Sequence, residues 1–99
     1  MVPRILPSAF DDLEKGRDFY NAQNEGVGIY FLETVFSEIE SLRIYAGIHG
    51  KKFGFYRLLV SKFPYAIYYK LEKEGAIVYR VLDCRSNPEK HKKALRYRE

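Results

Sequence analysis

The sequence has 99 residues, of which 46% are hydrophobic and 30% charged, and its formal net charge is +4 at neutral pH. A chain of this size forms one domain with a modest core, and this composition excludes a disordered or low-complexity protein. The single cysteine, Cys84, excludes an intrachain disulfide and a cysteine-based metal site, and no apolar run reaches the roughly 18 residues of a membrane span. We therefore predict one domain over residues 1–99, located in the cytoplasm, with no cofactor and no membrane contact.

The charges are distributed unevenly along the sequence. Residues 85–98 hold six basic side chains against one acid, Glu89, whereas most acids fall between residues 8 and 40. A basic C-terminal part indicates an acidic partner, which is either a nucleic acid or an acidic protein segment. A solvated, lysine-rich last helix is the plain alternative.

The first predicted elements are a short strand and a helix. A strand over residues 4–6 is bounded by Pro3 and Pro7, and proline is confined to the edges of sheets because it cannot donate to the ladder. A helix is predicted over residues 8–22, with Ser8 as its N-cap.

A second helix, from about residue 29 to residue 46, has the clearest periodicity. Its apolar residues recur every three or four positions, which predicts a stripe that faces the core. They are Ile29, Leu32, Val35, Phe36, Ile39 and Leu42. Gly47 is the predicted C-cap, and two successive amphipathic helices predict an antiparallel helical hairpin.

Three strands are predicted after a basic connecting loop at residues 49–52. The runs 55–61, 65–72 and 76–83 are rich in aromatic and β-branched residues, and the links between them are too short for anything but antiparallel hairpins. One face of the sheet should cover the helices, and the other should form a semi-open concave surface. Asn87 followed by Pro88 predicts a last helix to about residue 98.

These elements define an α+β fold of order β-α-α-β-β-β. The N-terminal strand and helical hairpin should pack on one face of an antiparallel sheet, with a short C-terminal helix after it.

Two arginines are candidate binding groups. The guanidinium groups of Arg57 and Arg85 suit phosphate or an acidic protein patch, and the alternative is a structural ion pair with Asp83 or Glu72. Asp83 itself either orients Arg85 or caps the turn after the last strand.

Other chemically active residues favour structural interpretations. Cys84 has no histidine fixed beside it in sequence, so we interpret it as a small strand residue rather than a nucleophile. His49 and His91 are far apart and lack carboxylates at metal-binding spacing, so no metal site is predicted. The tyrosines, including Tyr65 and Tyr69, are interpreted as packing on the sheet with their hydroxyl groups at the rim rather than as base-stacking platforms.

Several motifs match one known family, in that family's order. The run from Phe63 to Tyr69 is the most specific, and together the motifs span almost the whole chain. They are Phe10-Asp11-Asp12-Leu13 with Tyr20, Gly28-x-x-Phe31-Leu32, Arg57-x-x-x-x-x-Phe63-Pro64-Tyr65-Ala66-Ile67-Tyr68-Tyr69, Val78-x-x-Val81-Leu82 and Arg85-x-x-Pro88. On these residues the sequence resembles the RelE/ParE family of toxins from type II toxin–antitoxin systems, and it is closer to the ParE branch.

The resemblance to ParE implies a growth-inhibiting toxin of a plasmid-stabilisation type of system, which poisons DNA gyrase. It also implies a hetero-oligomer with a cognate antitoxin, whose C-terminal segment wraps the helical hairpin and the sheet. The candidate residues for binding the target or the antitoxin are Arg57, Arg80, Arg85, Lys90, Lys93 and Arg96. Arg80 lies mid-strand and should face solvent or the antitoxin.

The resemblance to RelE implies the alternative, a ribosome-dependent mRNA endoribonuclease, so whether the chain is an enzyme stays open. In that case Arg57 and Arg85 would stabilise the transition-state charge, and His91 or Tyr97 would act as acid or base. No histidine or tyrosine follows the last strand at once, which favours the ParE interpretation. A degenerate member that binds its antitoxin without poisoning anything is a third possibility.

Overall fold

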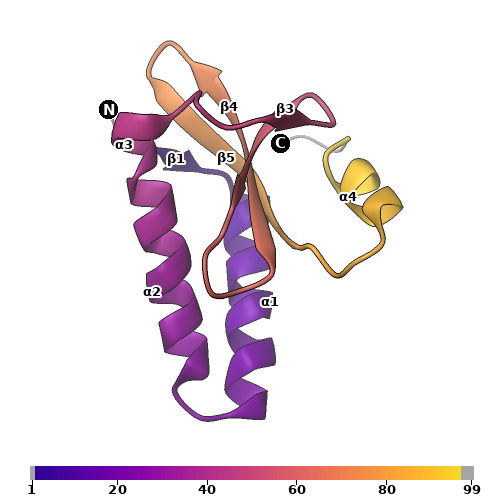
Figure 1. The fold of residues 1–99 in the computed structure, drawn as a ribbon. Helices are drawn as coiled ribbons and strands as arrows, with labels where there is room; N and C mark the ends of the chain where they lie inside the picture. The colour runs from indigo at the N-terminus through magenta and orange to yellow at the C-terminus, as the bar shows by residue number, and fades with distance from the viewer. Residues whose placement is uncertain (1, 97–99) are drawn as a thin grey trace.

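The computed structural model describes residues 2–96 and shows a helical hairpin against a twisted sheet, with a short helix on the other side of that sheet (Figure 1). Within these residues the sheet has five strands in the order β1-β5-β4-β3-β2. The elements in chain order are β1 (Arg4–Ile5), α1 (Pro7–Gln23), α2 (Val27–Glu40), α3 (Leu42–Tyr45), β2 (Lys51–Lys52), β3 (Phe55–Leu59), β4 (Tyr65–Glu72), β5 (Gly75–Asp83) and α4 (Pro88–Ala94).

The predicted α+β class and the order of its elements are confirmed. Strands β2 to β5 form an antiparallel meander, and β1 adds a parallel pair at the edge, with Arg4 opposite Ile77. The sheet is therefore mixed, because the α1–α2 hairpin carries the chain from β1 across one face before the meander begins.

One predicted loop contains a strand instead. Lys51 and Lys52 pair with Tyr56 and Phe55 as strand β2. The intervening turn has positive φ at Phe53 (57°) and at Gly54 (83°), which is the backbone of a tight two-residue hairpin. Phenylalanine seldom occupies that conformation, so the sequence gives a weaker hairpin signal here than Asn-Gly would.

Helix α1 begins one residue earlier than predicted, and Ser8 is not its cap. Pro7 occupies the first turn, where its missing N–H costs no hydrogen bond, and Leu6 is the N-cap residue. The Ser8 hydroxyl donates instead to the Tyr79 carbonyl oxygen of β5 at 3.0 Å. The serine thus ties the helix to the sheet.

Helix α2 is rotated relative to the predicted stripe. Ile29 and Phe36 are 58% and 40% exposed, whereas Gly28 and Phe31 are buried against α1. The cause is a close approach of the two helices, since a Cβ atom on Gly28 would lie 2.5 Å from the Arg17 carbonyl oxygen. The helical chain then breaks at Ser41 before α3. Helix α3 ends with Ala46 as its C-cap, one residue before the predicted Gly47, which follows at φ +95°.

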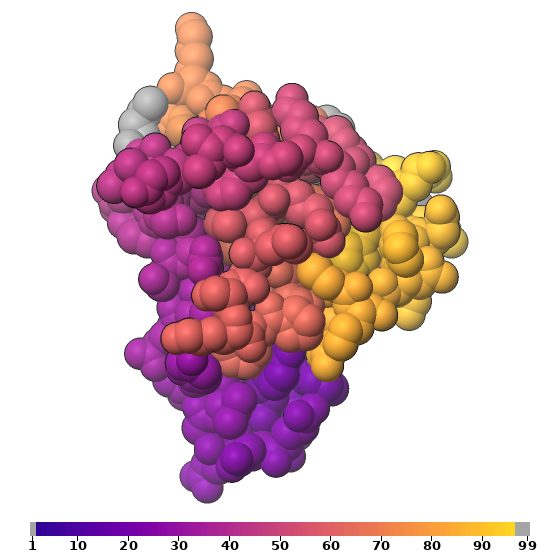
Figure 2. Space-filling view, viewed as in Figure 1, coloured from indigo at the N-terminus to yellow at the C-terminus, as the bar shows by residue number. Residues whose placement is uncertain are grey.

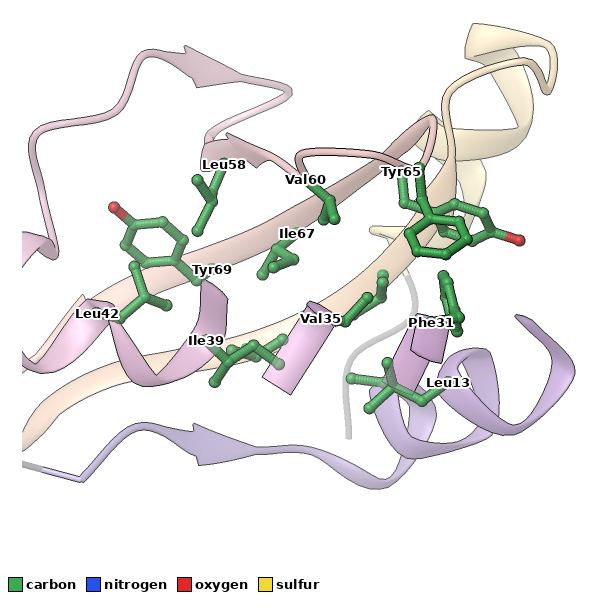
Figure 3. Packing of buried hydrophobic residues seen from close by; sticks show 14 of the residues in the cluster. Leu13, Phe31, Val35, Ile39, Leu42, Leu58, Val60, Tyr65, Ile67 and Tyr69 are labelled. Carbon is green, nitrogen blue, oxygen red and sulfur yellow. The ribbon is translucent and has the colours of Figure 1, made fainter. Parts of the chain in front are cut away.

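The main core lies between the helical hairpin and one face of the sheet (Figure 3). Each large apolar side chain buried there contributes about 1.5–3 kcal/mol. The core residues drawn and labelled in that figure are Leu13, Phe31, Val35, Ile39, Leu42, Leu58, Val60, Tyr65, Ile67 and Tyr69.

The second face of the sheet was expected to be semi-open, and the structure contradicts this. A smaller core of Phe55, Ala66, Tyr68 and Leu95 closes it, and Tyr68 is fully buried. Helix α4 supplies Leu95 just beyond its last turn and covers the sheet at this point. The apolar residues on both faces of the strands explain why a second cover is needed.

A bulge in β5 interrupts the regular alternation of its side chains between the two faces of the sheet. Tyr68 pairs with Arg80 but Tyr69 pairs with Val78, so Tyr79 is an extra residue. Val78 and Val81 therefore both face the helical hairpin, whereas Tyr79 packs on the second face. Strict alternation along the strand would instead place Tyr79 on the same face as Val81.

Helix α4 is shorter than predicted. Its N-cap is confirmed, because the Asn87 side chain accepts a hydrogen bond from the Glu89 N–H at 2.9 Å, and the helix ends at Ala94. Tyr97 lies outside the described residues. None of the helices within residues 2–96 has the length and apolar character needed to cross a membrane.

Candidate functional site

The exit of β5 carries a chain of hydrogen bonds that joins β3, β4 and α4. Arg57 Nε donates to the Tyr68 hydroxyl at 3.2 Å, and that hydroxyl lies 3.0 Å from His91 Nδ1. His91 Nε2 lies 2.7 Å from the Asp83 carbonyl oxygen. Since a carbonyl only accepts, Nε2 carries a proton, and in the neutral tautomer that this requires Nδ1 accepts from the Tyr68 hydroxyl.

These hydrogen bonds occupy both ring nitrogens of His91. The ring is 5% exposed and packs edge-on against the Tyr68 ring, with centroids 5.8 Å apart. In this arrangement His91 holds α4 on the sheet and presents no nitrogen to a substrate. Tyr68 was not singled out in the sequence, because its burial depends on α4.

Arg57 is half-buried beside Cys84 and forms neither of the two ion pairs considered from the sequence. Its Nη2 atom lies 3.7 Å from the Cys84 sulfur, and no acid within residues 2–96 forms an ion pair with it. Its neutral partners leave its positive charge on the α4 side of the sheet.

Arg85 lies toward α1 and is held by Asp83. Its Nε and Nη2 atoms contact the two Asp83 carboxylate oxygens at 3.0 and 2.8 Å, and the Arg85 N–H donates to the same carboxylate at 2.8 Å. Asp83 therefore both orients the arginine and caps the turn. The guanidinium also lies 5.8 Å from the centre of the Phe19 ring and 3.5 Å from the Tyr20 hydroxyl.

The electrostatics follow from this contact. The hydrogen bond from Arg85 lowers the pKa of Asp83 below its usual value, and the same bond raises the pKa of Arg85. Burial, aided by the nearby Asp83 charge, raises the pKa of Tyr65 to about 12. The Arg85 side chain is still 54% exposed, so it is charged, fixed in place and accessible.

The contacts place Arg57 and Arg85 on different faces of the sheet. Arg57 belongs to the α4 side with Tyr68, and Arg85 belongs to the α1 side with Phe19. The structure thus does not assemble the two arginines and His91 around one open point.

Arg80 is an internal clamp, which corrects the expectation that it faces solvent or an antitoxin. Its Nε and Nη2 atoms both lie 2.7 Å from the Asp12 carboxylate, and its Nη1 donates to the Ala94 carbonyl oxygen at 3.4 Å. Asp12 is 7% exposed and also accepts from the Val81 N–H. One residue thereby joins α1, β5 and α4.

A groove of about 480 Å³, here called the basic groove, lies between the β2–β3 turn and α4. It is lined by Phe53, Phe55, Lys92, Leu95 and Arg96. The ammonium groups of Lys52 and Lys70 lie over the Phe53 and Phe55 rings at 5.4 and 4.8 Å. Lys90, Lys93 and Arg96 are exposed on or beside α4, so this side of the molecule is strongly cationic.

A smaller groove of about 200 Å³, the hairpin groove, lies on the helical hairpin. It is lined by Phe10, Asp11, Leu13, Glu14, Arg17, Leu32 and Phe36. Its rim is mainly acidic, so the two grooves differ in charge. A third cleft of about 330 Å³, lined in part by Phe19, Tyr65 and Leu82, lies between α1 and β5 beside Asp83.

Neither histidine takes part in a metal cluster. His49 Nδ1 contacts the Tyr69 hydroxyl at 2.5 Å, and burial lowers the pKa of this histidine. Across residues 2–96, no three His, Cys, Asp or Glu side chains converge to hold an ion.

Comparisons with known proteins identify the fold. No protein-family model matches the sequence, and no curated protein matches it. A chain of the solved structure titled "Chromosomal ParDE TA system from P. aeruginosa" aligns with a TM-score of 0.73, over 82% of this chain and 92% of that one. The two sequences are 14% identical. The likeness confirms the expected ParE/RelE-type toxin fold, and at this identity it shows the fold alone.

Proposed function

We propose that this chain, which has the ParE/RelE-type toxin fold, is the toxin of a type II toxin–antitoxin pair that binds and poisons DNA gyrase. The fold supports the toxin assignment. The observation that favours inhibitory binding over hydrolysis is the state of His91, which is 5% exposed with both ring nitrogens engaged. A general acid or base must reach the group whose proton it transfers.

The target would be bound through Arg85 and the cationic side of α4. Asp83 pre-orients Arg85, so little side-chain entropy is lost on binding, and the Phe19 ring beside it is 46% exposed. Arginine and aromatic residues in such an arrangement often dominate binding energy. Lys90, Lys93 and Arg96 would steer an acidic patch of gyrase toward this surface.

The antitoxin would use the two grooves of opposite charge. An amphipathic helix fits the hairpin groove, where Phe10 and Phe36 are 50% and 40% exposed. An extended acidic segment fits the basic groove and the sheet edge near Leu59. Such wrapping gives the expected hetero-oligomer.

A RelE-like, ribosome-dependent mRNA endoribonuclease is the second candidate. It is favoured by the contacts between Arg57 and Tyr68 on the sheet and His91 on α4, which lie on the side of the sheet that carries the basic groove. Displacement of α4 would expose Arg57 and Tyr68 to a phosphodiester and would free both ring nitrogens of His91, which moves with the helix. Arg57 would then stabilise the transition-state charge. Tyr97 would then be the other candidate acid or base.

A gyrase supercoiling assay run beside a ribosomal mRNA-cleavage assay tests the two candidates. The toxin would be purified with the product of the neighbouring gene and then separated from it. Loss of supercoiling with intact mRNA supports the proposal. Cleaved mRNA with active gyrase overturns it and favours the nuclease.

The Arg85→Ala variant sharpens the first assay. We expect at least a tenfold loss of inhibition, about 1.4 kcal/mol of binding energy, as for an interface arginine. Arg43→Ala is the matched control, since Arg43 forms an exposed ion pair with Glu40 on the helices. The toxin assignment itself fails if expression causes no growth arrest and the purified chain forms no tight complex with the neighbouring gene product.

A further inference from the structure

An apolar patch made of Ile44, Tyr45, Ile48 and Leu71 lies where α3 and its following loop meet the end of β4. These side chains are 78%, 52%, 72% and 43% exposed, and Ile44 and Ile48 are the most exposed large hydrophobic residues within positions 2–96. Figure 2 shows this segment on the upper surface of the molecule, beside the β4–β5 turn. Contiguous exposed apolar surface marks an interaction site.

Hydrogen bonds to the buried Tyr69 hydroxyl fix the loop that carries the patch. The Gly47 N–H donates to the Tyr69 hydroxyl at 2.9 Å, and that hydroxyl also contacts His49 Nδ1. Gly47 has φ +95°, and a Cβ atom there would lie 2.9 Å from a Leu71 methyl carbon. The loop therefore packs closely against Leu71. The apolar surface of the patch is already formed before a partner binds.

Charge indicates which partner fits. The helical hairpin is acidic and the α4 side is basic, so two copies meeting through either surface would place like charges together. Charges of both signs adjoin the patch: the Glu40–Arg43 ion pair precedes Ile44, Lys70 and Glu72 flank Leu71, and Lys51 lines the same cleft as Leu71. In a two-fold contact each copy offers the same surface, so mixed charges can pair across the axis.

We propose that this patch is the contact of a symmetric homodimer of the chain. The assignment goes beyond the toxin function and depends on a different part of the molecule. Four exposed side chains per copy form an interface below the standard size, so the dissociation constant should be about micromolar or weaker.

Sedimentation velocity of the full chain, from about 1 µM to about 200 µM, tests the proposal. The wild-type chain should shift from monomer toward dimer over this range. The Ile44→Asp/Ile48→Asp double variant should stay monomeric throughout, because two buried, unpaired carboxylates per copy oppose the contact. The matched control is Ile29→Asp, since Ile29 is 58% exposed on α2 and lies outside the patch. It should dimerise as the wild type does.

Ionic strength separates this contact from an electrostatic one. An apolar dimer should persist at about 1 M salt, where charges are screened beyond roughly 3 Å. Association that disappears there would indicate a head-to-tail contact between the acidic hairpin and basic α4 of two copies, and it would overturn the proposal. A wild-type chain that stays monomeric, or a double variant that still dimerises, would also overturn it.

If the wild type is monomeric and the double variant no longer binds the antitoxin, the patch is a contact surface for the antitoxin and the homodimer proposal is overturned. The supercoiling assay reports on the toxin function independently of all these outcomes.

Discussion

The Tyr68 hydroxyl decides the role of two residues that appeared functional in the sequence. It is fully buried and joins Arg57 to His91. Buried polar groups require partners, and here the partners are the cationic and imidazole groups that a nuclease would need. At the scale of single residues, Arg57 and His91 are thus hydrogen-bonded inside the fold, whereas Arg85 remains exposed and oriented.

Replacing Tyr68 with phenylalanine should destabilise the protein by about 1–3 kcal/mol, because His91 Nδ1 and Arg57 Nε lose their shared partner inside the fold. Urea unfolding measures the loss, and hydrogen exchange in α4 should rise. Tyr79→Phe is the control on the same face, since no hydrogen bond of its hydroxyl is found within the described residues. Equal losses in the two variants would contradict a role for the Tyr68 hydroxyl.

The raised pKa of Tyr65 predicts a loss of stability in alkali. The folded-state pKa is about 12, against 10 for the ordinary group. The stabilisation is fully present below pH 10 and is lost as pH rises from 10 to 12, because only the unfolded chain ionises there. The free energy of unfolding should fall by up to about 1.4 kcal/mol per pH unit from this one group. Urea unfolding of Tyr65→Phe should show a shallower decline, and an identical pH dependence in both proteins would contradict the shift.

At the scale of elements, close packing determines two features that hydrophobic periodicity does not predict: the orientation of α2 and the side-chain pattern of β5. The glycine contact turns α2 so that Gly28 meets α1 and Ile29 points outward. The bulge at Tyr79 changes which side chains of β5 face the helices. Both features follow from neighbours in space rather than neighbours in sequence.

Gly28→Ala tests the packing of α1 against α2. Helix propensity alone favours alanine by about 1 kcal/mol, but the new methyl group would lie 2.5 Å from the Arg17 carbonyl oxygen, a backbone atom that cannot rotate away. We expect the clash to dominate and the free energy of unfolding to fall by about 1–3 kcal/mol. In the control, Gly50→Ala, a Cβ atom would meet nothing within 4 Å, so its stability should change little. A stabilised Gly28→Ala protein would refute the close approach.

At the scale of the whole molecule, the charges are segregated. Residues 7–40 hold eight acidic and two basic side chains, whereas the rest of the sequence holds five acidic and fifteen basic ones. The formal charges are therefore −6 and +10. Such a dipole orients an approaching charged partner before contact is made.

Reversing the α4 charges with Lys90→Glu, Lys93→Glu and Arg96→Glu should reduce gyrase inhibition at least about tenfold and weaken its dependence on salt. These side chains are exposed, so unfolding by urea should change little. The control reverses three exposed charges elsewhere, with Arg4→Glu, Lys62→Glu and Lys73→Glu. If both triple variants lose inhibition equally, net charge rather than the α4 surface is responsible.

The sequence alone predicted the order and type of most elements, because periodicity, capping and turn chemistry act between residues close together in the chain. It also indicated that Asp83 could orient Arg85, since the two are neighbours. It did not predict strand β2, whose turn places a phenylalanine in a conformation that this residue seldom adopts.

The closing of the second sheet face and the Asp12–Arg80 clamp required the tertiary structure. Asp12 and Arg80 are 68 positions apart, and no local pattern tells a buried ion pair from two solvated charges. His91 was equally ambiguous, because its role depends on Tyr68 lying under α4. Local sequence thus determined the helices, most of the strands and the uneven charge. Only packing between distant segments decided which polar groups are bound inside the fold and which remain available to a partner.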